Sequence, residues 1–405
     1  MTRRHVVLGN GIAGQACAEE LRRLDADCSI AMVAAERHPL YDRAALPRLL
    51  DGRQRQDGLL LRSPEEYGDL GIEIHFETWA TEVDARERVV RTNRAQELHY
   101  DRLLIATGGR PKPPPWPGSD EVDEAFGLRT LDDARALAGK LEGAACVLVA
   151  GGGRVALQLA ETIAGRRGPS LVWATRGPWP LPDLLDREGG ELCRRLAEQA
   201  GVELVAEELT RFSRREGRYA GETVSGRRVE FDLLAYDAGL DYYLEPALGT
   251  GIETRRGVVT DSRLRTAVPD VYAAGDVALV LDLLVGRHTQ LGSWDHALAQ
   301  GTLAARNMAG EDRELLAVST YTTGVFGSTL TLLGITPDVE PGLESRGSHS
   351  LEEGFYRRLY FQEERLVGAV LLGASPGQAK LVEIMRSRRA VGRAKEELLE
   401  LVGPV

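Results

Sequence analysis

The sequence predicts an α/β protein in which two Rossmann-like domains, each of three layers, are joined to a small C-terminal α+β domain. Two observations carry this prediction. The segment from His5 to Glu19 is echoed by the segment from Val147 to Glu161, and each reads as a buried strand, a glycine turn and an alanine-rich helix. The chain also has 405 residues, more than one ordinary core accommodates, so several domains are expected.

The first glycine turn has the spacing of a dinucleotide-binding motif. A strand, Val6 to Leu8, runs into Gly9, Gly11 and Gly14. In this pattern the first glycine permits the tight turn, the second lets a diphosphate approach the backbone, and the third lets helix and strand pack closely. The helix that follows offers its N–H groups and the positive end of its dipole. Glu36 follows the next strand, Ser29 to Ala34, where its carboxylate can accept hydrogen bonds from a ribose diol.

Two later strands also end in glycine. One runs from Tyr100 into Ala106-Thr107-Gly108, and the other runs from Asp270 into Gly275-Asp276. In an open α/β sheet the ligand binds at the carboxyl ends of the strands, so these residues are predicted to border the first turn. Asp276 is expected to bind a ribitol hydroxyl; the alternative is that it caps the next helix.

Composition excludes several classes of function. The net charge of −11 has the wrong sign for a general binder of nucleic acid or of anionic membranes. The four cysteines show no paired spacing and the seven histidines are scattered, so neither a disulphide framework nor a metal site is expected. With no signal-peptide core and no long apolar run, the protein is expected to be cytoplasmic and not inserted in a membrane.

Together these motifs resemble the pyridine nucleotide–disulphide oxidoreductase superfamily. The similar branch comprises rubredoxin reductases, ferredoxin reductases and the flavin domain of nitrite reductases. The segments that carry the resemblance are the glycine turn with Glu36, the Tyr-Asp-Arg stretch in 39–48, Ala106-Thr107-Gly108, the second glycine turn at Gly151, 264–276, and 294–310.

The resemblance implies non-covalently bound FAD, a nicotinamide nucleotide as hydride donor to flavin N5, and an FAD domain built from two sequence segments. A proline-rich run, Pro111 to Gly118, marks the crossover to the second domain. Beyond Gly310 the chain reads as strand-rich over 321–335 and 355–372 and as helical over 378–402. The predicted domains are FAD-binding, residues 1–115 and 245–315; NAD(P)-binding, 116–244; and a C-terminal interface domain, 316–405.

The implied site residues follow from the same resemblance. Arg48 stands where the branch has a lysine near flavin N5, and would supply charge without a mobile proton; the alternative is a surface arginine that caps a helix. Arg43 is expected to contact a phosphate, and Gln158 replaces a glutamate near the nicotinamide. Arg48 and Gln158 are the predicted catalytic residues. Trp294 or Gln300 is expected to border the flavin ring; the alternative for Trp294 is an ordinary core aromatic. The predicted FAD contacts are Gly9, Gly11, Ile12, Ala13, Gly14, Glu36, Arg43, Arg48, Ala80, Ala106, Thr107, Gly108, Gly275, Asp276 and Trp294.

The second glycine turn does not decide which nicotinamide nucleotide binds. It keeps Gly151, Gly153 and Ala156, but Thr175 and Arg176 stand where an acidic residue would hold a ribose 2′-hydroxyl. A threonine and an arginine would instead tolerate or attract a 2′-phosphate. Three interpretations remain: NADPH binding, NADH binding in a relaxed site, or a domain that keeps the fold without the nucleotide.

The sequence departs from the disulphide-reducing relatives, because no redox cysteine pair and no flavin-side cysteine near residues 44–47 is present. Cys17 is expected to pack as a small hydrophobic residue. The predicted function is therefore an FAD-dependent NAD(P)H:acceptor oxidoreductase. The alternatives are an electron-transfer subunit of a larger redox complex without nicotinamide activity, and an oxidase.

The expected partner is a small electron-carrier protein or a redox complex, with a homodimer as a further alternative. A basic stretch from Arg386 to Lys395 is a candidate face for an acidic carrier; the alternative is a solvated helix face.

Overall fold

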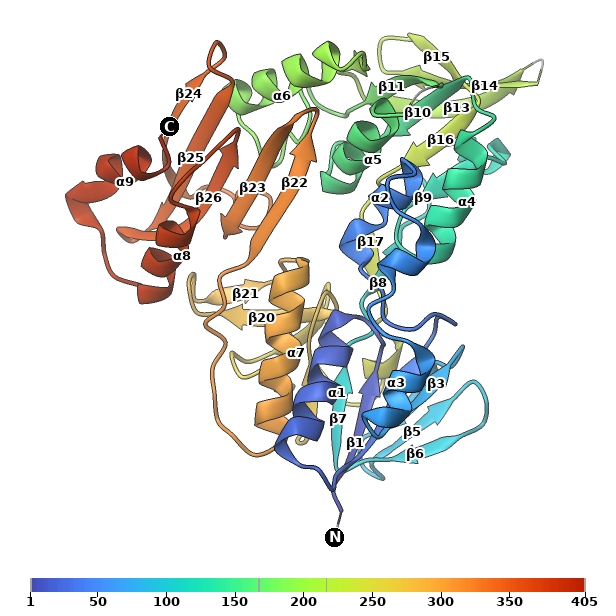
Figure 1. Cartoon of the computed structure of the whole chain (residues 1–405), viewed down its shortest axis with the longest axis vertical. Helices are drawn as coiled ribbons and strands as arrows, with labels where there is room; N and C mark the ends of the chain where they lie inside the picture. The colour runs from blue at the N-terminus through green and yellow to red at the C-terminus, as the bar shows by residue number, and fades with distance from the viewer. Residues whose placement is uncertain (1, 167, 216, 404–405) are drawn as a thin grey trace. The chain divides into compact units, whose positions relative to one another are not determined.

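The computed structural model describes residues 2–166, 168–215 and 217–403. The chain forms two compact units (Figure 1). The first contains the chain up to Asp42, Leu60–Arg110 and Asp241–Tyr321, and the second contains Arg43–Leu59, Pro111–Leu240 and the chain from Thr322. The short strands β8 (Gly109–Pro111) and β17 (Leu240–Tyr242) lie where the chain passes from one unit to the other.

The first unit is built on a parallel five-stranded sheet of order β19-β7-β1-β2-β3. Its central strands are almost wholly apolar and buried, as expected for a parallel sheet covered on both faces. The strands are β1 (Arg4–Leu8), β2 (Ser29–Ala34), β3 (Ile72–Phe76), β7 (Arg102–Ile105) and β19 (Val271–Ala273).

Two long helices of this unit, α1 (Ile12–Leu24) and α7 (Trp294–Met308), lie side by side (Figure 1). Their approach is close, because a Cβ atom at Gly301 would overlap the backbone of Ala13. Smaller elements complete the unit. They are α3 (Pro64–Asp69), the antiparallel strands β4 (Ala80–Asp84), β5 (Val89–Thr92) and β6 (Glu97–His99), the strands β18 (Val258–Thr260), β20 (Ala278–Asp282) and β21 (Arg287–Thr289), and the turn η4 (Glu245–Ala247).

The second unit repeats the parallel arrangement with the strand order β12-β11-β10-β16-β9. Its elements are β9 (Ala125–Gly127), β10 (Cys146–Ala150), β11 (Ser170–Ala174), β12 (Glu203–Val205), β16 (Leu233–Tyr236), α4 (Leu131–Leu141), α5 (Arg154–Ala164), α6 (Arg187–Gln199), the 3-10 turn η3 (Ser119–Glu121), and an antiparallel sheet of β13 (Leu209–Arg215), β14 (Arg218–Thr223) and β15 (Arg228–Phe231). The short helix α2 (Pro47–Leu50), between the turns η1 (Arg43–Ala45) and η2 (Gln56–Leu59), packs against α5 in this unit.

The C-terminal part of the second unit is a five-stranded sheet of order β22-β23-β26-β25-β24. It comprises β22 (Thr320–Val325), β23 (Ser328–Gly334), β24 (Glu344–Ser350), β25 (Phe355–Gln362), β26 (Arg365–Leu372), α8 (Gln378–Ser387), η5 (Gly392–Ala394) and α9 (Lys395–Leu401). The helical prediction for 378–402 is wrong in one respect, because Arg388 takes a left-handed conformation (φ 55°) and ends α8.

The predicted α/β class with two Rossmann-like sheets and a C-terminal antiparallel sheet is confirmed. The three domain boundaries stay a prediction. Within the described residues, none of the helices combines the length and the apolar character needed to cross a bilayer.

Candidate functional site

The first glycine turn is tight at two positions and open at the third. Gly9 has φ +115°, and a Cβ atom there would overlap the carbonyl oxygen of Ala106. A Cβ atom at Gly14 would overlap the carbonyl oxygen of Gly9. At Gly11, by contrast, no described atom outside the glycine and its two chain neighbours lies within 4 Å of the Cβ position. The turn therefore folds tightly against its own strand and leaves space at the middle glycine.

The start of α1 has the character of an anion site. Gly11 is the N-cap residue, none of the described side chains caps it, and no acidic residue lies in the first turn. The N–H groups of a first helical turn have no partner within the helix and carry the positive end of its dipole. The open space at Gly11 and these donors together fit the diphosphate of FAD.

Side chains hold this turn in place, and the sequence did not single out two of them, Asn10 and Tyr67. Asn10 donates to the carbonyl oxygen of His38 at 3.4 Å and accepts from the Tyr67 hydroxyl at 2.9 Å. Tyr41 donates to Glu36 at 2.7 Å, so the predicted ribose-binding carboxylate is oriented from its own loop. These contacts join the loop after β2 to the glycine turn, and only the spatial arrangement reveals them.

The two glycine-terminated strands meet the first turn, as predicted. Ala106 donates to the carbonyl oxygen of Leu8 at 2.8 Å, and the Thr107 hydroxyl donates to the carbonyl oxygen of Tyr243 at 2.8 Å. A Cβ atom at Gly275 would lie 3.0 Å from that of Ala13. The alternative for Asp276, a helix cap, is wrong, because strand β20 follows it.

The start of α7 contains a buried polar cluster beside Gly275. Gln300 accepts from the Gly275 amide at 2.7 Å, and its Nε2 lies 3.1 Å from His296 Nδ1. Both side chains are buried, and the hydrogen bond of Gln300 links α7 to the backbone that follows β19. Burial lowers the pKa of His296 to about 4, against the opposing effect of Asp295 and Asp276. Trp294, the first residue of the helix, is partly exposed.

Ala80 lies at the start of β4 and packs in the hydrophobic core of the first unit. The structure thus brings most of the predicted FAD contacts into one unit. These are Gly9, Gly11, Ile12, Ala13, Gly14, Glu36, Ala80, Ala106, Thr107, Gly108, Gly275, Asp276 and Trp294.

The two predicted flavin-side arginines lie in the second unit. Arg43 donates to the carbonyl oxygen of Arg129, and Arg48 is part of α2. This segment is tied to α5, since Arg166 donates to the carbonyl oxygen of Leu50. A phosphate contact for Arg43 and a catalytic role for Arg48 stay predictions.

The second glycine turn is covered by side chains. The Trp173 indole donates to the carbonyl oxygen of Gly151 at 2.9 Å. A Cβ atom at Gly152 would lie 3.3 Å from Pro182, and one at Gly153 would overlap the carboxylate of Asp237. This turn therefore lacks the open space found at Gly11.

The residues after β11 have partners of their own. The Thr175 side chain is buried, and its hydroxyl donates to the carbonyl oxygen of Gly177 at 2.9 Å. Arg176 pairs with Asp183 at an exposed position. An exposed pair of this kind contributes little to stability, so the arginine is free to exchange partners.

One face of α5 carries two polar side chains. Gln158 donates to the Thr323 hydroxyl at 3.5 Å. Glu161, one turn later, was not predicted; burial raises the pKa of its carboxyl, and a Cβ atom at Gly324 would lie 2.6 Å from it. A carboxyl with a raised pKa beside the predicted nicotinamide contact is a candidate site residue.

None of the four cysteines is joined to another in the described part of the chain. All four are free, and Cys17 is fully buried. Burial raises the pKa of the Cys17 thiol and so disfavours the reactive thiolate. Among the described residues, no group of three metal-ligating side chains lies together.

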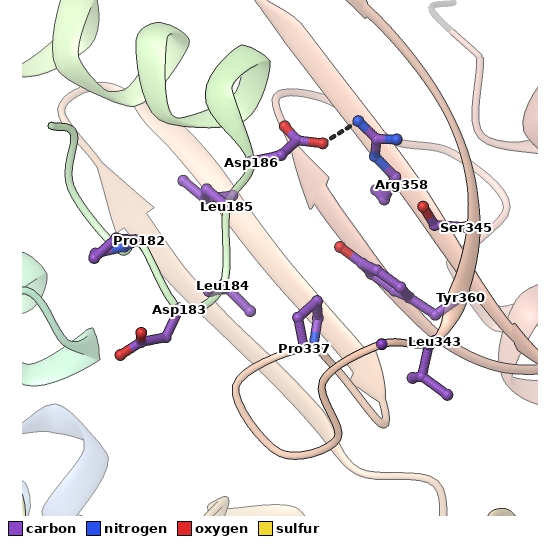
Figure 2. Close-up of a pocket in the computed structure, with 11 residues that line it drawn as sticks. Pro182, Asp183, Leu184, Leu185, Asp186, Pro337, Leu343, Ser345, Arg358 and Tyr360 are labelled. Atoms are coloured by element: carbon purple, nitrogen blue, oxygen red, sulfur yellow. Dashed lines mark hydrogen bonds and ion pairs between the residues drawn. The ribbon is translucent and has the colours of Figure 1, made fainter. Parts of the chain in front are cut away.

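A pocket of about 280 Å³ lies in the second unit (Figure 2). Figure 2 shows Asp186 pointing towards Arg358, with which it forms an ion pair, while Tyr360 lies nearby. The pocket is lined by Pro182–Asp186, by the loop between β23 and β24, and by residues of β24 and β25. None of the predicted site residues lines it, although Pro182, one of its lining residues, also lies against the second glycine turn.

Comparison with known proteins identifies the family. A family model described as pyridine nucleotide-disulphide oxidoreductase matches residues 3–301. The ferredoxin–NAD(+) reductase component of the anthranilate 1,2-dioxygenase system of Burkholderia cepacia is 31% identical over 82% of this chain and 81% of its own length. The assimilatory nitrate reductase electron transfer subunit of Bacillus subtilis is 26% identical over 98% of this chain, which spans about half (51%) of that relative.

The fold has a close counterpart among solved structures. The covalent putidaredoxin reductase–putidaredoxin complex contains a chain that superposes with a TM-score of 0.89 at 23% identity, covering 98% of this chain and 95% of that one. The predicted superfamily and branch are confirmed. With its open first glycine turn, the chain belongs to the pyridine nucleotide-disulphide oxidoreductase family and is an FAD-dependent oxidoreductase.

Proposed function

We propose that this chain takes hydride from a nicotinamide nucleotide and passes electrons, through FAD, to a small electron-carrier protein. The observation that carries the proposal is the open turn at Gly11, which lies beside two further strand ends, Thr107 and Asp276, in the first unit. The relatives named as ferredoxin and rubredoxin reductases support the same class of acceptor.

FAD supplies the redox chemistry, since a flavin accepts two electrons together and releases them singly. The chain contributes binding and charge. The N–H groups at the start of α1 hold the diphosphate, Glu36 binds the ribose and Asp276 the ribitol chain. Arg48 is proposed to supply positive charge near the flavin, and Gln158 to contact the nicotinamide.

The donor is proposed to be NADPH or NADH. Thr175 and Arg176 favour a 2′-phosphate, because the ion pair of Arg176 with Asp183 is exposed and a phosphate can replace it. A cytoplasmic location and a homodimer remain predictions.

A second candidate is an electron-transfer subunit of a larger redox complex that has no nicotinamide activity. Two observations favour it: the covered second turn, and the half-length match to the nitrate reductase electron transfer subunit.

Anaerobic titration separates the two candidates. The purified yellow protein is titrated first with NADPH and then with NADH, while flavin absorbance in the visible is recorded. Bleaching by either nucleotide is the expected result and identifies the donor. If dithionite bleaches the flavin and neither nucleotide does, the nicotinamide donor is wrong and the subunit function stands.

A further inference from the structure

The two glycine turns of the chain share a motif but differ in what occupies them. At Gly11, in the first turn, no atom of the described chain beyond the glycine and its two neighbours lies within 4 Å of the Cβ position. At Gly153, its counterpart in the second turn, the Cβ position is filled by a carboxylate oxygen of Asp237. Because the middle glycine is where a diphosphate approaches the backbone, Asp237 stands at the position that matters most for binding.

The carboxylate of Asp237 makes the contacts that a phosphate would make. Its Oδ2 accepts from the Ala156 amide at 3.2 Å, a donor in the first turn of α5. Its Oδ1 accepts from the Gly239 amide at 3.1 Å. Asp237 follows β16, whose backbone is fixed beside the turn because the Asp237 amide donates to the carbonyl oxygen of Ala150 at 2.9 Å.

Pro182 covers the same turn from another segment. Its ring lies 3.3 Å from the Cβ position of Gly152 and 3.0 Å from that of Gly177. The preceding residue, Leu181, is buried with φ 55°, a left-handed conformation that a leucine rarely adopts. Pro182, which covers the second glycine turn, therefore follows a residue in a strained backbone conformation.

We propose that the Asp237 carboxylate occupies the diphosphate position of the second nucleotide site, so that a nicotinamide nucleotide binds only by displacing it. This inference rests on the proposed function for the identity of the ligand. Two negative groups cannot share the N–H donors of one helix start, so the carboxylate competes with the diphosphate both for hydrogen bonds and through charge. Asp237 is then a residue that sets nucleotide affinity, and it contributes to neither electron transfer nor FAD binding.

The test measures binding, independently of electron transfer. ADP-ribose carries the diphosphate without the nicotinamide, so calorimetric titration of the FAD-loaded protein with ADP-ribose reports the site directly. Titration with NADH and NADPH then gives the affinity of the complete nucleotides. The variants are D237N, which removes the charge at nearly constant shape, and D237A, which removes the carboxylate.

Asp232 offers a matched control. It lies at the opposite end of β16 and also accepts from two backbone amides, those of Ala145 and Cys146, at 3.0 and 2.8 Å. D232N therefore removes one negative charge and perturbs two backbone hydrogen bonds of the same sheet, away from the glycine turn. Thermal unfolding and FAD content of each variant verify that the fold is kept.

The expected result is that D237N and D237A bind ADP-ribose and the nicotinamide nucleotides at least about tenfold more tightly than the unmodified chain, with D232N unchanged. Equal or weaker binding by the Asp237 variants would overturn the inference while leaving the proposed function intact. If no form binds any of the three ligands although each keeps its FAD, both the inference and the nicotinamide donor are wrong.

Discussion

At the scale of single residues, the free space at each Cβ position distinguishes a glycine needed for packing from one needed for ligand binding. Gly9, Gly11 and Gly14 belong to one motif, yet only Gly11 has both an ordinary extended conformation (φ −80°, ψ 177°) and free space at its Cβ position. The packing demand at Gly9 and Gly14 is structural, whereas the demand at Gly11 comes from the ligand. This separation makes it possible to remove the cofactor without removing the fold.

We expect Gly11→Ala to lose FAD and keep the apoprotein fold, because its methyl group enters only the space of the diphosphate. The cost to apoprotein stability should stay below about 1 kcal/mol, as for an alanine at an N-cap. Gly14→Ala should instead destabilise the apoprotein by about 1–3 kcal/mol through overpacking. Flavin absorbance and denaturant unfolding measure the two effects; equal destabilisation by both would contradict this division.

The sequence predicted these glycines because their spacing alone encodes the turn. It did not predict Asn10 and Tyr67, nor Asp237, because those side chains act through contacts between segments far apart in the chain. The same limit explains Glu161, whose raised pKa comes mainly from burial that no local pattern reveals.

At the scale of elements, the long buried strands and helices were predictable and the exposed edges were not. Strand β24 has a largely exposed, polar sequence that gives no alternating pattern, and it forms only because its backbone pairs with β25. The buried strand β2 matches its predicted range of 29–34. The burial pattern, more than intrinsic propensity, made these elements predictable from the sequence.

The close approach of α1 and α7 gives a prediction for Gly301. An alanine there would overlap the backbone of Ala13, so G301A should separate the helices and destabilise the protein by about 1–3 kcal/mol, with loss of FAD. Gly139 is the matched control, since it lies at an exposed position inside α4, with no described atom beyond the backbone of its own helix and its two neighbours within 4 Å of its Cβ position. G139A should stabilise by about 0.5–1 kcal/mol. Equal effects in denaturant unfolding would show that α1 and α7 are less tightly packed at Gly301 than the Cβ overlap implies.

At the scale of the whole molecule, buried ionisable groups and surface charge set the response to pH and salt. Burial lowers the pKa of both His5 and His296 to about 4. The sequence could not predict this, because the histidines look scattered until the sheet and α7 surround them. The sequence also assigned Lys395 to the predicted basic face. Its charge is offset there, because Lys395 pairs with Glu344 and Glu364 at 2.9 and 2.8 Å.

The histidines predict a loss of stability in mild acid. In the unfolded chain a histidine binds its proton near pH 6.5, whereas His296 in the folded chain does so only near pH 4. Between these values the unfolded state binds more protons, so the free energy of unfolding falls as the pH is lowered through this window. His296 alone should contribute on the order of 3 kcal/mol of this loss by pH 4.

The variant H296N should therefore show a flatter dependence of unfolding free energy on pH between 6.5 and 4. The exposed His99 gives the control H99N, which should follow the unmodified chain. A pH dependence in H296N as steep as in the unmodified chain would mean that His296 is protonated in the folded state.

The remaining basic face predicts how an acidic carrier docks. Arg386, Arg388, Arg389 and Arg393 are exposed, and none of them forms an ion pair within the described residues. Against a net charge of −11, such a group supplies the local positive potential that an acidic carrier needs. Because exposed charges are screened beyond about 8 Å at physiological salt, reduction of an acidic ferredoxin should slow as salt is raised.

Charge reversal at Arg389 tests whether this face, and not the overall charge, guides the carrier. R389E should lower the second-order rate of ferredoxin reduction several-fold at low salt and flatten its salt dependence, because attraction is replaced by repulsion. R228E changes the net charge equally at an exposed position of β15 and should leave the rate nearly unchanged. Stopped-flow reduction at a series of salt concentrations measures both. Equal losses in the two variants would assign the effect to net charge. No loss in R389E would mean that the carrier docks elsewhere and that these arginines are only a solvent-exposed surface at the end of α8.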